Sequence, residues 1–219
     1  MNTIRIWFTK TGEASYISLL DLQRVMHRSL KRSGLPVWYT MGFNPHIYLT
    51  FACPLPLGQE SLVESVDCKT EEQNIDFAFW KDTLNTVMPL GIVVTRVEPA
   101  ALKAEHIGFA RYTVTSRNPG MAAAIEAYNA AASVPVEKKS KRGVKTIELK
   151  EHLPQIEIFP EKEGCRFDLV LPASDTVNLN PILLLNHIAE TSGIPATDSS
   201  ILRTALYTKA GELFSPEES

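Results

Sequence analysis

The chain has 219 residues, of which 44% are apolar and 21% are charged, and its formal net charge is −3 at pH 7. Such a chain can bury one large core or two cores of about 100 residues each. The slightly negative charge excludes a protein whose whole surface attracts nucleic acid, so any such affinity must come from local patches. No apolar run approaches the roughly 20 residues of a membrane helix, and no signal segment is evident, so we expect a cytoplasmic protein.

The three cysteines, Cys53, Cys68 and Cys165, lie far apart in the sequence. Disulfide frameworks, zinc ribbons and iron–sulfur clusters all need thiols at closer or repeated spacing. We therefore expect three buried structural thiols, and no metal or cofactor held by this chain.

The first half of the chain is predicted to form a βαββαβ unit. Alternating residues from Ile4 to Lys10 indicate a half-buried strand, and Ser18 can cap a helix that runs to Ser33 and stops at Gly34. Alternating or β-branched residues predict strands over 37–41, 47–52, 62–68 and 92–97. A helix is expected from Ile75, capped by Asn74, to Pro89.

The second half repeats this order. Asn118-Pro119 and Asn180-Pro181 each place a capping asparagine before a proline that suits the first helical position. Strands are expected over 109–116, 144–149, 155–159, 165–171 and 201–207. We predict an α+β protein of two tandem ferredoxin-like (βαββαβ) halves with antiparallel sheets, over residues 1–98 and 108–209, and a disordered tail over 210–219.

The most informative stretch lies between residues 8 and 58. Its motifs are, in order, Phe8-Thr9-Lys10-Thr11-Gly12, Ser18-Leu19-Leu20-Asp21-Leu22, Arg24, Arg28, Arg32-Ser33-Gly34-Leu35-Pro36, Gly42-Phe43-Asn44-Pro45-His46 and Pro54-Leu55-Pro56-Leu57-Gly58. In order and spacing they resemble the radical-SAM-linked protein family, which is encoded beside, or fused to, a radical SAM protein. This chain departs from the family at Leu19, where the family usually has histidine, and at Ile47, where it usually has a further proline.

The resemblance implies an accessory protein that presents a substrate, possibly tRNA or rRNA, to a separate radical SAM enzyme. The iron–sulfur cluster and S-adenosylmethionine would then belong to that partner, and this chain would need no catalytic activity of its own.

Two groups of cations could bind the phosphates of RNA. The first shares one face of the predicted helix: Arg24, Arg28, Lys31 and Arg32. The second lies at a predicted hairpin: Lys138, Lys139, Lys141, Arg142 and Lys145. Lys10 is a further candidate. If both groups bind one strand of RNA, they should lie on one surface, and replacing Arg28 and Arg142 should weaken the dependence of binding on salt. The alternatives are an ordinary solvated helix face and a charged turn that protects a sheet edge.

His46 is the main candidate for chemistry because it leaves the turn formed by residues 42–46, where an accessible imidazole can titrate near neutral pH. Asp21 is its candidate partner. Each also has a structural interpretation, as a hydrogen bond within the loop for His46 and as a charge at the helix N-terminus for Asp21. Two other functions stay open: an enzyme acting on RNA or a small molecule through His46 and Asp21, and a protein-binding adaptor.

Overall fold

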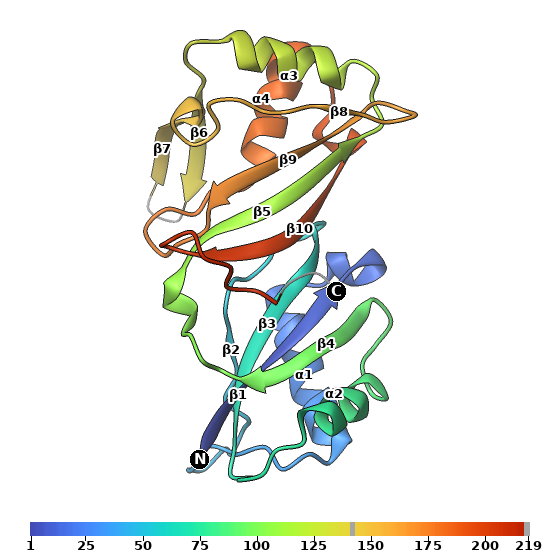
Figure 1. Cartoon of the computed structure of the whole chain (residues 1–219), viewed down its shortest axis with the longest axis vertical. Helices are drawn as coiled ribbons and strands as arrows, with labels where there is room; N and C mark the ends of the chain where they lie inside the picture. The colour runs from blue at the N-terminus through green and yellow to red at the C-terminus, as the bar shows by residue number, and fades with distance from the viewer. Residues whose placement is uncertain (141–142, 217–219) are drawn as a thin grey trace. The chain divides into compact units, whose positions relative to one another are not determined.

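The structure, a computed structural model, describes residues 1–140 and 143–216 (Figure 1). It divides into two compact units, Met1–His106 together with the terminal segment that begins at Phe214, and Ile107–Leu213. Both units combine helices with antiparallel strands, which confirms the predicted mixture of α and β structure. Within the described ranges, no helix has the length and apolar character needed to span a membrane.

The first unit contains one sheet and two α-helices. Its elements are β1 (Asn2–Lys10), η1 (Gly12–Tyr16), α1 (Leu19–Ser33), β2 (Thr50–Phe51), β3 (Glu60–Thr70), α2 (Phe77–Asn85), β4 (Ile92–Pro99) and η2 (Ala104–His106). Strand β1 lies between β4 and β3, and β2 pairs with β3; each of these pairs is antiparallel. The sheet order within this unit is therefore β4-β1-β3-β2.

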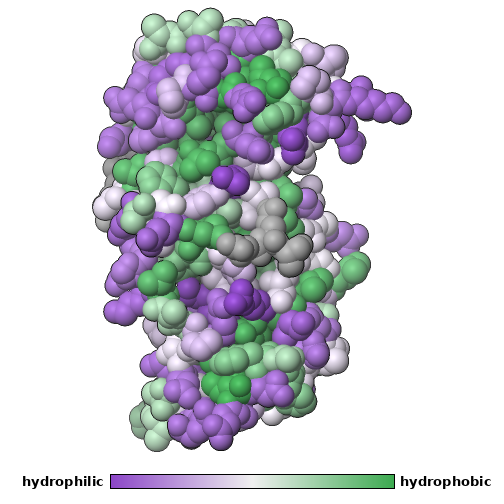
Figure 2. Space-filling model, in the orientation of Figure 1, coloured by the Kyte–Doolittle hydropathy of each residue, from purple (hydrophilic) through white to green (hydrophobic). Residues whose placement is uncertain are grey.

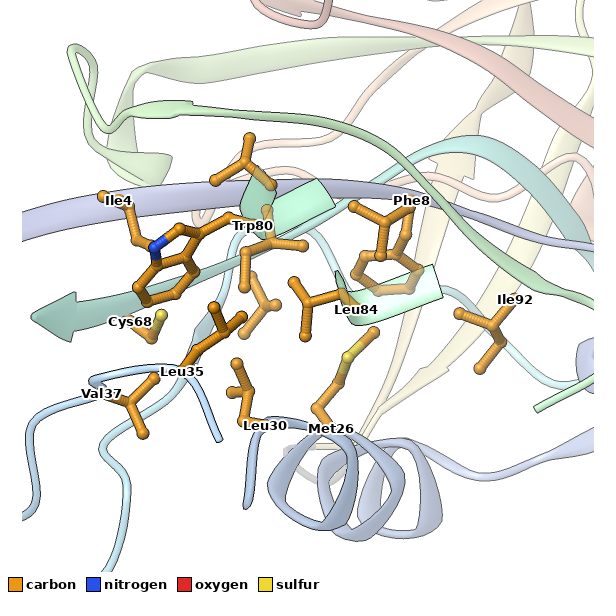
Figure 3. Packing of buried hydrophobic residues seen from close by; sticks show 14 of the residues in the cluster. Ile4, Phe8, Met26, Leu30, Leu35, Val37, Cys68, Trp80, Leu84 and Ile92 are labelled. Atoms are coloured by element: carbon orange, nitrogen blue, oxygen red, sulfur yellow. The ribbon is translucent and has the colours of Figure 1, made fainter. Parts of the chain in front are cut away.

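The core of the first unit lies between this sheet and the helices α1 and α2 (Figure 3). Ile4, Ile6 and Phe8 project from one face of β1 because side chains two residues apart share a strand face. They pack with residues of α1 and α2, including Met26 and Trp80.

The opposite face of β1 is also buried, so the prediction of a half-buried strand is wrong. Arg5 makes two hydrogen bonds to Asp67, of 2.7 and 2.8 Å, and its guanidinium lies 4.8 Å from the centroid of the Phe214 ring. The ring of Trp7 meets Phe214 edge to face, with the centroids 6.0 Å apart. Phe214 of the terminal segment thus covers this face. The structure describes residues 210–216 of the tail that was expected to be disordered, and residues 217–219 lie outside the described part of the chain.

The second unit has a separate hairpin beside its sheet. Its elements are β5 (Ile107–Ser116), α3 (Met121–Ala130), β6 (Pro135–Ser140), β7 (Gly143–Glu148), η3 (Leu149–Glu151), β8 (Phe159–Pro160), β9 (Cys165–Pro172), α4 (Ile182–Ser192), η4 (Ala196–Asp198) and β10 (Ser199–Thr208). The sheet order within this unit is β10-β5-β9-β8, whereas β6 and β7 pair only with each other.

Three predicted strands are much shorter than expected. Segment 37–41 contributes only isolated bridges at Val37 and Tyr39, segment 47–52 contributes the two residues of β2 and a bridge at Ile47, and segment 155–159 contributes one residue of β8. The Trp38 amide donates to the carbonyl of Lys69 in β3 at 2.8 Å, but the Thr40 amide donates to the carbonyl of His46, also at 2.8 Å. Beyond Trp38 the segment therefore pairs with its own loop and not with β3.

Two helices begin later than predicted. Asp76, not Asn74, caps α2, since its carboxylate accepts a hydrogen bond of 2.9 Å from the amide of Phe79. The side chain of Asn118 accepts from the amide of Gly120, at 3.0 Å, and α3 begins only at Met121. An asparagine before proline here stabilises the turn that precedes the helix.

Candidate functional site

Local capping positions α1, the helix that carries the first group of cations. The Ser18 hydroxyl accepts a hydrogen bond of 3.1 Å from the amide of Asp21, and Gly34 ends the helix with a left-handed φ of 69°. Both features confirm the predicted caps. The helix packs Leu22, Met26 and Leu30 into the core, so the opposite side faces solvent.

The solvent-facing side of α1 carries all four predicted cations: Arg24, Arg28, Lys31 and Arg32. Arg24 donates to Asp21 at 2.9 Å. Hydrogen bonds from Ser18 and Arg24 hold the pKa of the Asp21 carboxyl below its usual value. Among the described residues, no carboxylate pairs with Arg28, Lys31 or Arg32. The three cations that follow Arg24 are therefore available to an external anion.

The loop that contains His46 presents exposed side chains. Met41 and Phe43 extend into solvent, and Tyr39 is partly exposed. The His46 Nδ1 lies 3.1 Å from the Thr40 hydroxyl and 3.1 Å from the Asn44 carbonyl oxygen. The imidazole thus hydrogen-bonds its own loop, which matches its structural interpretation.

The proposed catalytic pair has separate partners. His46 bonds within its loop, whereas the carboxylate of Asp21 accepts from Ser18 and Arg24. Nothing in these contacts joins the two side chains, so they do not support a shared role as acid and base.

Sequence reasoning missed His27, which is partly buried on α1. Burial lowers the pKa of its imidazole, and the charge of His46 lowers it further. Because this Coulomb effect weakens with distance, it indicates that the imidazole of His46 lies within electrostatic range of His27 on α1. In the sequence, the only indication of an interaction between His27 and His46 was a histidine on the predicted helix, next to its cationic face.

Acidification is expected to destabilise the first unit through His27. A histidine whose pKa is lower in the folded than in the unfolded state binds fewer protons when folded, so the free energy of unfolding falls as pH drops below about 6.5. Urea unfolding of the His27→Gln variant should show a weaker loss of stability over this range than the unmodified protein. His46→Gln should also reduce this loss of stability, but by less, because it removes only the effect of the His46 charge on His27. An identical pH dependence in the His27→Gln variant would contradict this assignment.

Lys10 does not belong to a phosphate-binding surface, which corrects the sequence-based prediction. Its side chain is 2% exposed, and its ammonium donates to the Ser15 carbonyl at 2.9 Å. Lys10 follows Ile4, Ile6 and Phe8 on the core-facing side of β1, so strand parity directs it inward.

The second group of cations lies on the predicted hairpin, formed by β6 and β7. The ammonium of Lys138 donates to the carbonyl of Asn178, and Lys145 is exposed. The side chain of Lys139 and the whole of Lys141 and Arg142 lie outside what the structure describes. The helix and the hairpin belong to different units, and their placement on one surface stays a prediction.

Two of the three cysteines are buried as expected. Burial and the charge of Asp67 raise the pKa of the Cys68 thiol to about 12, and burial also raises the pKa of Cys165. Cys53 is only half-buried, because it lies in the irregular segment after β2. In the ranges that the structure describes, no three His, Cys, Asp or Glu side chains form a group that could hold a metal ion.

The face in view in Figure 2 mixes hydrophilic and hydrophobic side chains, so candidate surfaces have to be identified from individual contacts. Those contacts and the fold define an antiparallel α+β protein with an exposed cationic helix face. Residues 3–181 match the family described as "Uncharacterized protein conserved in bacteria (DUF2344)", and the chain belongs to this family. A comparison with curated proteins finds no match.

Proposed function

We propose that this protein binds RNA through the solvent-facing side of α1 and presents it to a separate radical SAM enzyme, without catalysing a reaction itself. The observation that carries the RNA-binding part is the set of exposed cations that pair with no carboxylate in the described part of the chain: Arg28, Lys31 and Arg32. A phosphate can replace the mobile counterions around such cations without first breaking an ion pair, and this release drives binding.

The neighbouring loop supports RNA over a generic polyanion. Phe43 and Tyr39 are exposed aromatic side chains of the loop that contains His46, and unstacked bases of single-stranded RNA stack on such rings. A cationic helix and exposed aromatic residues are the two kinds of contact that single-stranded nucleic acid uses. The substrate would be an unpaired segment of tRNA or rRNA.

The radical SAM partner is proposed from the motifs of residues 8–58. The buried thiols of Cys68 and Cys165, with their raised pKa values, are unsuited to ligate a cluster as thiolates. This supports placing the iron–sulfur cluster and S-adenosylmethionine in the partner. Cys53, Cys68 and Cys165 form no disulfide in the described part of the chain, which also supports the proposed cytoplasmic location.

We also propose that each unit is ferredoxin-like. The support is the sheet order within each unit, β4-β1-β3-β2 and β10-β5-β9-β8, with helices α1 and α2 in one and α3 and α4 in the other. In both orders, the first and third strands of the unit are central and antiparallel.

Removing two cations from α1 should reduce the salt dependence of RNA binding. Each phosphate neutralised on a single strand contributes about 0.7 to the slope of log affinity against log salt concentration. The double variant Arg28→Ala, Lys31→Ala should therefore flatten the slope for a single-stranded oligoribonucleotide by roughly 1.4 units. Fluorescence anisotropy over a range of salt concentrations measures this slope.

The matched control removes two cations that already pair with carboxylates. Lys81 lies 3.7 Å from Asp82 and Arg96 lies 2.8 Å from Glu98. The variant Lys81→Ala, Arg96→Ala changes the net charge by the same amount and should leave the slope nearly unchanged. Equal slopes in both double variants would remove α1 as the RNA-binding face.

Copurification from native cells tests the partner, and a preparation that lacks any iron–sulfur protein would count against the accessory role.

Turnover by the isolated protein that is lost in His46→Ala would support the enzyme alternative instead. RNA-independent binding of a protein partner that resists high salt would support the adaptor alternative, because phosphate contacts weaken steeply with salt.

A further inference from the structure

A pocket of about 380 Å³ opens on the first unit, away from the residues used above. It is lined by residues of β1, β2, β3 and η2, together with Tyr48, which precedes β2, and Lys103, which precedes η2. This volume is within the range of about 300–1,000 Å³ that is usual for small-ligand sites.

The floor of the pocket is the face of the sheet that does not contact α1 and α2. In the antiparallel pairs, Thr3 lies opposite Lys69 and Thr50 lies opposite Asp67. Directly opposed residues share a sheet face, and these four alternate with the core-facing residues Ile4 and Cys68. The pocket is thus a site separate from the solvent-facing side of α1.

The wall of the pocket combines an aromatic ring with a cation. Tyr48 is 53% exposed. The Lys69 ammonium lies 6.0 Å from the centroid of the Tyr48 ring and 5.5 Å from that of Trp38. Within the described ranges, no carboxylate forms an ion pair with Lys69, and its ammonium makes cation–π contacts with these two rings.

The polar groups on the floor are also available. In the described chain, no hydrogen bond uses the hydroxyls of Thr3 and Thr50. Asp67 is held in place by Arg5 through two hydrogen bonds, which leaves acceptor capacity on its oxygens. On the rim, Lys103 is already 3.7 Å from Glu105, so Lys69 is the free cation of the lining.

We infer that this pocket binds a nucleotide, with the base stacked on Tyr48 and the phosphate next to Lys69. A flat ring suits the exposed aromatic face, and base N–H groups can donate to the fixed carboxylate of Asp67. The hydroxyls of Thr3 and Thr50 suit the ribose or the phosphate. A free mononucleotide and one nucleotide of an RNA strand share this chemistry. Only the second source rests on the proposed RNA binding.

Trp38 provides the readout, because the other two tryptophans, Trp7 and Trp80, are buried. Adenosine 5′-monophosphate and uridine 5′-monophosphate should each change the fluorescence of Trp38 saturably, and calorimetry should give the affinity. Tyr48→Ala should weaken binding by about 5-fold to 150-fold, the range measured for losing one base–aromatic stack. Tyr48→Phe retains the ring and should bind nearly as well as the unmodified protein.

The charge of Lys69 has its own test. Lys69→Met should weaken binding of adenosine 5′-monophosphate but not of adenosine, whereas Lys69→Arg should retain the difference between the two ligands. If Tyr48→Ala fails to fold by circular dichroism, Tyr48→Leu and the Lys69 variants decide the question. The absence of saturable binding, or binding that is unaffected by every Tyr48 and Lys69 variant, would overturn the inference.

The two sources are separated by competition with a short single-stranded oligouridylate. An oligomer that displaces uridine 5′-monophosphate, and binds more tightly than it, supports a nucleotide within RNA; binding of the monomer alone supports a free nucleotide. The Arg28→Ala, Lys31→Ala variant should still bind the monomer in either case. If this variant shows a flatter salt slope for RNA binding and still binds the monomer, the result agrees with both proposals. If its salt slope is unchanged, the result contradicts only the role of α1.

Discussion

Replacing Trp80 by alanine is expected to lower the free energy of unfolding by about 3–5 kcal/mol. Trp80 is 1% exposed and packs in the core between the sheet and the two helices of the first unit (Figure 3). Its indole N–H also donates to a Glu72 carboxylate oxygen at 3.0 Å. Truncation would remove the apolar contacts, leave a cavity and delete this hydrogen bond.

Phe79, the preceding residue on α2, supplies the control for this prediction. Its side chain is 60% exposed, so Phe79→Ala should change stability by only about 0.5 kcal/mol. Both variants introduce alanine into α2, so the helix propensity of the new residue is the same. Chemical denaturation monitored by circular dichroism gives the free energy of unfolding of each variant. A similar loss of stability in both would show that α2 does not pack as described.

The second large effect is expected at Gly164, in the turn between β8 and β9. Gly164 has a φ of 78°, and an added Cβ would lie 2.0 Å from the carbonyl oxygen of Ser116. Alanine would carry the strain of a left-handed conformation, about 1–2 kcal/mol, and would also force the backbone of β5 to move. We expect Gly164→Ala to lower the free energy of unfolding by about 2–5 kcal/mol in total.

Gly193, which ends α4, separates these two contributions. Its φ is 72°, and no atom lies within 4 Å of an added Cβ. Gly193→Ala should therefore show the conformational strain alone, about 1–2 kcal/mol. Thermal or urea unfolding of the two variants gives the difference, which measures the close approach of the turn to β5. Equal losses would mean that the turn can move away without penalty.

The parts of the molecule that sequence alone determined depend on neighbours in the chain. The Ser18 hydroxyl needs only the amide of Asp21, three residues away, and Gly34 needs only its own backbone freedom. The spacing of the cations along α1 likewise follows from the helical repeat. For this reason the helix, both of its caps and its cationic face were predictable residue by residue.

Sequence was least reliable where several local choices compete. Asn74 and Asp76 are both good capping residues, and the register of α2 on the core selects the second. The segment 37–52 has β-prone residues, yet its proline, Pro45, and its internal hydrogen bonds leave only two residues, Thr50 and Phe51, in a strand. Propensity indicates what a segment can form, whereas packing and available partners decide which possibility occurs.

Tertiary structure alone decided which polar groups are buried and which are available. The alternation in β1 shows that Lys10 shares a face with Ile4, but its burial depends on the contact with η1, which contributes the carbonyl of Ser15. Arg5 is buried because Asp67 and Phe214, both far away in the sequence, meet on it. The pocket proposed to bind a nucleotide arises in the same way, from residues of three strands and a short helix together with Tyr48 and Lys103. The alternation of a strand tells whether each side chain faces inward or outward, but not which distant segment covers the outward face. Only the folded chain brings Lys69 near the rings of Trp38 and Tyr48, with no carboxylate paired to it among the described residues.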